Sequence, residues 1–242
     1  MVTLFIRLLV AKESFLPSTN TTCWTIIEAA SRGQTSEREE FAQRYEGPVR
    51  AYLTNRWRHS RLLQMVDDTV QDVFIECFRA DGPLHRADRN RSRGFRPYLF
   101  GIVRNVARGT ERRHRRGNQN EQESPIDLEL IESDETALTQ VFDRAWALSI
   151  MKQAAQRQSE LAQATGKEAV QRVELLRKRF QDGLPIREIA KEWNVEAADL
   201  HREQTKARHE FLVALLDVLS FHNPGSNAEI QHEAEKMLAM LR

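Results

Sequence analysis

The chain has 242 residues, of which 40% are hydrophobic and 29% charged, and its formal net charge is +1. This composition excludes an intrinsically disordered chain and a membrane protein built from long apolar spans. The two cysteines, Cys23 and Cys77, are far apart in the sequence. They exclude a disulfide scaffold and a cysteine-based zinc site, and they predict a reducing, cytoplasmic environment.

The N-terminal segment, residues 1–21, contains an apolar run interrupted by Arg7. We expect no secretory signal here, because no basic stretch precedes the run and no small-residue cleavage site follows it. The run is also too short to span a bilayer. We predict an extension outside the fold, or a start codon assigned upstream of the true one.

Helical patterns begin after this extension. Thr22 or Thr25 is a candidate N-cap for a first helix, which Gly33 ends. Ser36 and Glu39 have the spacing of a capping box and predict the start of a second helix.

The segment 65–79 predicts a strongly amphipathic helix, because its apolar side chains recur at helical spacing on one face. Cys77 lies on that apolar face and is predicted to be a core residue. The other face is polar and acidic, with Asp67, Asp68, Gln71, Asp72 and Glu76. A protein-docking or solvated face is the favoured interpretation, since Gln71 breaks the DDxxD magnesium pattern and no second carboxylate cluster occurs.

The near-neutral total charge conceals a basic block followed by an acidic one. Residues 86–116 contain eleven arginines and two acids, and residues 118–143 contain eight acids and no lysine or arginine. Charge runs are often only solvated surface. Arginine, however, forms paired hydrogen bonds to phosphates and to the edge of guanine. This block therefore favours an anionic polymer as partner.

The arginine block comprises a polar loop over 80–94 and a third predicted helix, with Pro97 in its first turn. Arg104, Arg108 and Arg112 recur at steps of four and therefore share one face of this helix. After it, residues 118–136 lack a sustained period and predict a flexible acidic linker.

Helical signal resumes over 137–165 and 168–181, and residues 184–216 have the pattern of a helix-turn-helix. Asn194 suits a left-handed turn and Val195 is expected to fill the corner between the two helices. The second helix exposes side chains suited to a DNA major groove: His201, Arg202, Thr205, Lys206 and Arg208. An ordinary helical hairpin is the alternative for this segment taken alone.

The predicted fold class is therefore all-α, with two helical domains joined by an acidic flexible linker. The sequence has no P-loop, GxSxG or HExxH motif, and its seven histidines are scattered. We expect no enzyme activity, no metal, no cofactor and no small-molecule substrate. A metal-dependent nuclease built on the acidic helix is the enzymatic alternative.

Several segments resemble bacterial RNA polymerase sigma factors of the extracytoplasmic-function (ECF) type. MVDDTVQDVFIECFR resembles their most characteristic segment, DDxxQ(D/E)VF, and EFAQRYEGPVRAYL is similar to the helix before it. FRPYLFGIVRNVARGTERRHRR resembles the helix that follows. VELLRKRFQDGLPIREIAKEWNVEAADLHREQTKARHEFL is similar to their C-terminal promoter-binding domain. The resemblance covers roughly Trp24 to His222, with a gap at the linker.

The resemblance implies a factor that binds core RNA polymerase, directs it to promoter DNA and assists DNA opening. It implies a region-two domain at 22–117, the linker at 118–136 and a region-four domain at 137–222. The tail 223–242 is extra to the family and is predicted as a helix from its own apolar spacing. The polymerase-binding residues would be Asp67, Asp68, Gln71, Asp72 and Glu76. The minus-ten promoter strand would contact Arg89, Arg91, Arg93, Arg96, Arg104, Asn105, Arg108 and Arg112. The helix-turn-helix residues given above would contact the minus-thirty-five element, and an anti-sigma factor is a further expected partner.

The chain also departs from the family. NVEAADLHRE stands where GVxxGTVKSR is usual, so that Asp199 replaces a threonine and Glu203 a frequently basic residue. Carboxylates in a groove repel phosphates unless they accept hydrogen bonds from cytosine amines. The alternative function is a stand-alone helix-turn-helix regulator that binds duplex DNA.

Overall fold

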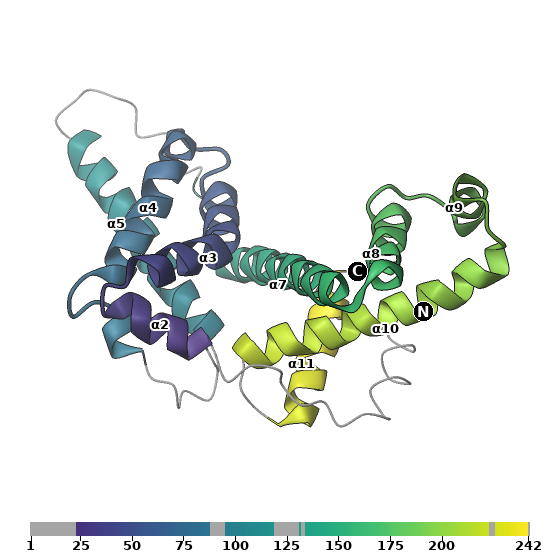
Figure 1. Ribbon diagram of the computed structural model, residues 1–242. Helices are drawn as coiled ribbons and strands as arrows, with labels where there is room; N and C mark the ends of the chain where they lie inside the picture. The colour runs from purple at the N-terminus through teal and green to yellow at the C-terminus, as the bar shows by residue number, and fades with distance from the viewer. Residues whose placement is uncertain (1–22, 88–94, 119–130, 132–133, 223–225, 242) are drawn as a thin grey trace. The chain divides into compact units, whose positions relative to one another are not determined.

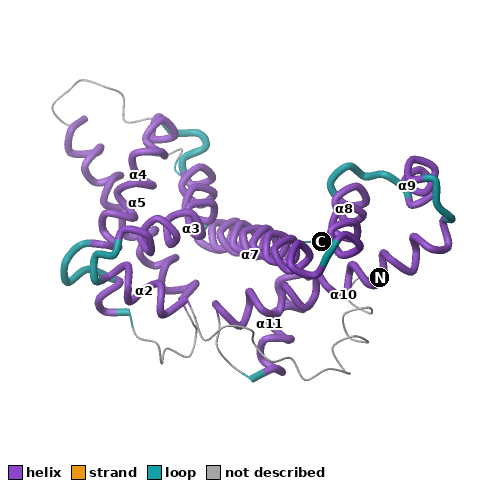
Figure 2. The backbone as a smooth tube through the Cα atoms, viewed as in Figure 1, coloured by secondary structure: helices purple, strands orange, loops and turns teal. Residues whose placement is uncertain are grey.

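The computed structural model describes residues 23–87, 95–118, 131, 134–222 and 226–241. Within these ranges all regular secondary structure is helical, which confirms the predicted all-α class (Figure 2). The predicted extension 1–21 and most of the predicted linker lie outside the described residues.

The contacts divide the chain into two compact units. The first unit comprises the described residues of Thr19–Ser149, Phe221–Asn223 and Ala239–Arg242, and the second comprises those of Ile150–Ser220 and Pro224–Leu238. The division falls inside helix α7 (Glu135–Thr165). The sequence instead predicted that the second domain starts at residue 137. In the structure, the first half of α7 belongs to the first unit.

The first unit is built from four helices and the first half of α7 (Figure 1). These helices are α2 (Cys23–Ser31), α3 (Thr35–Arg56), α4 (Val66–Phe78) and α5 (Phe95–Asn118), with short 3-10 turns at Arg61–Met65 and Leu84–Arg86. Helix α2 packs against α3, α3 packs against α4, and α4 packs against α5. Aromatic rings fill the core: Phe41 lies edge-on to Tyr45 at 4.6 Å and to Phe95 at 5.7 Å between ring centroids.

The first half of α7 and the last turn of α10 complete this core. Phe142 of α7 lies 5.2 Å from Phe100 of α5, and Trp146 stacks on Tyr45 at 5.2 Å. His222, the last residue of α10, is buried, and its Nδ1 lies 3.2 Å from the hydroxyl oxygen of Tyr45. Burial of these large rings is a major source of stability for the unit.

The second unit contains the second half of α7, all of α8 (Lys167–Phe180) and α9 (Ile186–Trp193), and all but the last residues of two further helices. These two helices are α10 (Ala197–His222) and α11 (Asn227–Met240). A small core joins α8, α9 and α10 through Leu175, Ile186, Ile189, Ala190 and Leu200.

Two local predictions have definite outcomes. The capping box at Ser36 and Glu39 is wrong: α3 begins at Thr35, and Gln34 occupies the N-cap position with no side-chain hydrogen bond. The reason is that Gly33, at φ 94°, ends α2 and the next helix starts at once. Cys77 is a core residue as predicted, and burial raises the pKa of its thiol to about 12.

Candidate functional site

The outward face of α4 combines the predicted acidic residues with one large apolar side chain. Asp67, Asp68 and Gln71 are exposed, whereas Asp72 and Glu76 are half-buried. Ile75 lies one turn from Gln71 and Asp72, on the same face, and is 66% exposed. The helix therefore presents an acidic surface around an apolar centre.

Some carboxylates of this face are bound within the first unit. Asp67 pairs with Arg50 of α3, and Asp72 Oδ2 lies 3.0 Å from Arg113 Nη2 of α5. Asp68 forms no ion pair or hydrogen bond with another residue in the part of the chain that the structure describes. Its charge is therefore available to a partner.

The residues predicted to bind the minus-ten strand differ in exposure. Arg89, Arg91 and Arg93 lie outside the described residues. The others are on α5: Asn105, Arg108 and Arg112 are exposed, while Arg96 and Arg104 are half-buried. The structure thus brings together on one helix those predicted residues that it describes.

Acids of α7 bind two of these arginines. Arg108 Nη2 donates to Glu135 Oε1 at 2.8 Å. Arg96 Nε lies 3.4 Å from Asp143 Oδ1. Of the basic face predicted from the helical spacing, Arg108 is therefore paired with Glu135, which the sequence placed in the linker. Arg96, outside that face, is paired with Asp143 of the predicted second domain.

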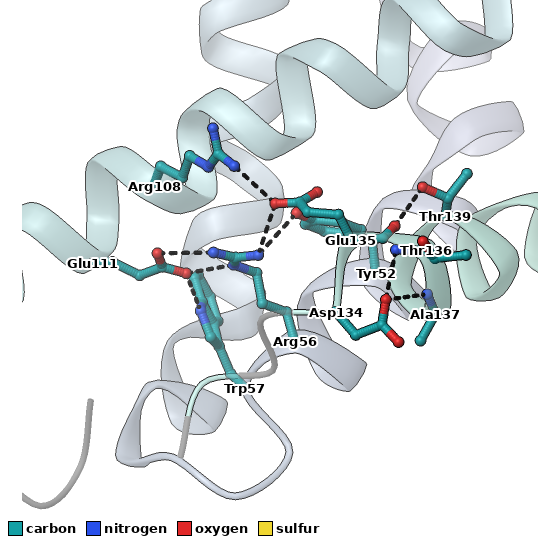
Figure 3. A network of polar contacts seen from close by, with 10 residues as sticks. All are labelled: Tyr52, Arg56, Trp57, Arg108, Glu111, Asp134, Glu135, Thr136, Ala137 and Thr139. Atoms are coloured by element: carbon teal, nitrogen blue, oxygen red, sulfur yellow. Dashed lines mark hydrogen bonds and ion pairs between the residues drawn. The ribbon is translucent and has the colours of Figure 1, made fainter. Parts of the chain in front are cut away.

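A buried ion pair joins Arg56 and Glu111, and Figure 3 shows the side chains around it. The side chains of Arg56 and Glu111 are only 7% and 10% exposed, and Arg56 Nη2 donates to Glu111 Oε2 at 3.1 Å. Trp57 Nε1 donates to the same carboxylate at 2.9 Å. Arg56 Nη1 also lies 3.6 Å from Glu135 Oε1. The network therefore links α3, α5 and α7.

Asp134 fixes the start of α7 and with it the position of Glu135. The carboxylate of Asp134 accepts hydrogen bonds from the backbone N–H groups of Thr136 at 2.8 Å and Ala137 at 3.1 Å. These bonds satisfy N–H groups that the first turn of a helix leaves open. This cap was not predicted from the sequence, although an aspartate before a helical pattern is a recognisable signal.

The turn between α9 and α10 has the predicted left-handed residue. Asn194 has φ 51° and ψ 49°, and the N–H of Val195 donates to the carbonyl of Ala190 at 3.0 Å. Val195 itself is 43% exposed, so the prediction that it fills the corner is wrong. Ala190 belongs to the small core of α8, α9 and α10.

The polar face of α10 neutralises most of its own charge. His201, Arg202, Thr205 and Lys206 are exposed as predicted. Arg202 pairs with Asp199, and Lys206 Nζ lies 2.7 Å from Glu203 Oε1. Arg208 is half-buried over the ring of Phe180 at 5.5 Å. Desolvation, followed by the charge of Arg179, lowers the pKa of Arg208.

Arg172 of α8 is a further charged residue near this face, and the sequence analysis missed it. Its guanidinium lies 3.2 Å from Glu203 and 2.7 Å from Glu210. Hydrogen bonds from Lys206 and then from Arg172 lower the pKa of Glu203. Glu203 is therefore held as an anion by two cations.

The described residues contain no group of three or more His, Cys, Asp or Glu side chains that could hold a metal ion. No helix in the described ranges is both long and apolar enough to cross a membrane. Neither finding assigns a function.

Comparison with known proteins adds no identification, since no family model, curated protein or solved structure matches this chain.

Proposed function

We propose that the chain is an ECF-type sigma factor that binds core RNA polymerase in the cytoplasm, directs it to promoters and assists DNA opening. The observation that carries this proposal is the outward face of α4, where Asp67, Asp68 and Gln71 are exposed around an exposed Ile75. The proposal also rests on the sequence resemblance of this segment to sigma factors.

The α4 face suits a protein partner better than water. A single exposed isoleucine is common on protein surfaces, so Ile75 argues for an interface only through its place among exposed carboxylates, as an apolar residue within a polar surround. The carboxylates around it favour a basic partner surface, and charge complementarity would set its register. A basic surface of the polymerase would satisfy both requirements.

The remaining surfaces fit nucleic acid. The exposed arginines of α5, on the helix that packs against α4, would bind phosphates of the minus-ten strand. The first turns of α10 would enter the major groove of the minus-thirty-five element. The chain would act by binding only, without a catalytic residue of its own.

A stand-alone helix-turn-helix regulator is the second candidate. The left-handed turn at Asn194 favours it, because this turn joins two helices as a duplex-binding motif requires. Such a regulator would have no use for the α4 face and would normally be a dimer.

Co-purification with core RNA polymerase at moderate salt tests the proposal. Wild-type tagged chain is expected to retain polymerase in near-equal amounts, and Asp68→Arg with Asp72→Arg is expected to retain at least about a hundredfold less. The matched control is Glu28→Arg with Glu46→Arg, which makes the same charge change on α2 and α3. A wild-type chain without polymerase, found as a dimer on duplex DNA, would support the regulator instead.

A further inference from the structure

Two carboxylates of α7 bind arginines that the proposed function assigns to the promoter strand. Glu135 lies against Arg108 at 2.8 Å, and Asp143 lies against Arg96 at 3.4 Å. Both acids belong to the first half of α7, which is held on α5 by the contact of Phe142 with Phe100. The acids are therefore fixed in place by packing, rather than meeting the arginines by chance on a mobile segment.

Glu135 is incompletely satisfied in this position. Its Oε1 is shared between Arg108 and Arg56, at 2.8 and 3.6 Å. Its Oε2 is buried and has no hydrogen-bond partner among the described residues. Arg104, one turn before Arg108 on α5, likewise has a buried Nε without a partner. A buried polar atom without a partner is costly, so these contacts are not an optimised structural ion pair.

A phosphate group is a better partner for this surface than a single carboxylate. It offers more acceptor oxygens and accepts paired hydrogen bonds from a guanidinium. The donor atoms that make these contacts, Arg108 Nη2 and Arg96 Nε, are occupied by carboxylates, and a carboxylate beside a guanidinium also repels an incoming phosphate. When a competing group occupies some of the sites, the apparent affinity of a ligand equals its intrinsic affinity multiplied by the fraction of sites that are free.

We propose that Glu135 and Asp143 act as an intramolecular competitor, which occupies Arg108 and Arg96 and weakens the binding of single-stranded nucleic acid to α5. The inference rests on the proposed function for the identity of the strand. It adds a built-in restraint on that site: the first half of α7 must release these arginines before the strand can bind them fully.

The test compares the full-length chain with the variant Glu135→Gln and Asp143→Asn. Both changes preserve side-chain shape, and the N-cap at Asp134 is left intact. The probe is a fluorescein-labelled single-stranded DNA of twelve nucleotides, with affinity measured by anisotropy over a range of salt concentrations. The variant is expected to bind about fivefold more tightly, since two half-buried carboxylates no longer compete for the arginines. Two additional phosphate contacts should also steepen the salt dependence by about 1.4 in log–log slope.

The matched control is Glu28→Gln with Glu40→Gln. Glu28 is exposed on α2 and Glu40 is half-buried on α3, and each pairs with an arginine four residues later, Arg32 and Arg44. The double change gives the same change in net charge. The control is expected to bind less than about twofold more tightly, with an unchanged salt slope.

Equal affinities and slopes in the variant and the control would overturn the inference, because only the general charge would then matter. Far-ultraviolet circular dichroism establishes that each variant is folded. Should the double variant not fold, Asp143→Asn alone makes the same comparison with a shift of about half that slope. Polymerase co-purification is a separate measurement: retained polymerase with no gain in strand affinity would contradict the inference alone, and a gain without polymerase would contradict the proposed function alone.

Discussion

The two helices predicted to bind DNA, α5 and α10, hold their charges in different ways. On α5, Arg96 and Arg108 pair with acids of α7, and the pair of Arg108 and Glu135 spans 27 positions of the sequence. On α10, Arg202 pairs with Asp199 three residues earlier in the same helix. The first kind of pair depends on the tertiary fold, whereas the second exists wherever the helix forms.

This difference determines what a partner must overcome. Exposed pairs within one helix are worth only about 0.3–0.5 kcal/mol, so they yield readily to phosphates. Pairs between helices are held in place by the packing around them. The pair of Arg108 and Glu135 is also connected to the buried pair of Arg56 and Glu111, because Glu135 contacts Arg56 as well. The charges of α5 are thus part of the fold, and those of α10 are largely surface.

The largest effect is expected from breaking the buried pair. Glu111→Ala would leave the Arg56 guanidinium buried without its carboxylate and would also remove the acceptor of Trp57. Such losses cost about 3–5 kcal/mol, and we expect this decrease in the free energy of unfolding in urea titrations. Glu174→Gln, which removes an exposed partner of Arg177, is the control and should change stability by less than about 0.5 kcal/mol. Equal effects of the two variants would show that burial does not distinguish the pairs.

The next largest effect on stability is expected at the C-terminal end of α10, and this effect depends on pH. His222 is buried beside Tyr45 and Trp146, and desolvation, with a smaller contribution from the charge of Arg44, lowers its pKa from 6.5 to about 3. The unfolded chain therefore binds a proton that the folded chain excludes between pH 6.5 and about 3. Stability from this group is complete above pH 6.5 and falls as the pH decreases, by about 2 kcal/mol at pH 5.

Urea titrations at pH 7 and pH 5 test this for the wild type and for His222→Gln. The variant loses stability at both pH values but should lack the additional loss of the wild type at pH 5. The other titratable groups are common to both proteins, so the difference between them isolates His222. An identical acid sensitivity in the two proteins would show that His222 is not buried as a neutral side chain.

The sequence predicted what depends on local pattern, and it missed what depends on distant partners. The repeat of Val66, Val70, Val73 and Cys77 was sufficient to identify the buried face of α4, and the residues of its outward face followed directly. The pair of Arg56 and Glu111 spans 55 positions, and nothing in either neighbourhood marks it. Helical spacing alone predicted a continuous basic face on α5, because it carries no information about the acids of α7 that pack there. For the same reason the division inside α7 was missed, since a continuous helical pattern does not reveal which unit each half contacts.

A smaller effect is expected at the turn before α10. Asn194 adopts the left-handed conformation, which costs a residue with an ordinary Cβ about 1–2 kcal/mol and costs glycine almost nothing. Asn194→Ala should therefore lower the stability of the second unit by about 1 kcal/mol, and Asn194→Gly should leave it nearly unchanged. Thermal unfolding measured by circular dichroism distinguishes the two, and the same loss in both would contradict the role of backbone conformation here.

The smallest effect is expected from the charges on α10 itself. Asp199→Asn removes an exposed pair within one helix and should change the free energy of unfolding by less than about 0.5 kcal/mol. Glu203→Gln should cost more, because Glu203 also pairs with Arg172 of α8, whose side chain is only 12% exposed. The ratio of these two losses measures how far a pair between helices exceeds a pair within one. Equal losses would mean that the pair of Arg172 with Glu210 is enough to stabilise the Arg172 side chain, and that Glu203 adds no stabilising contact between α10 and α8.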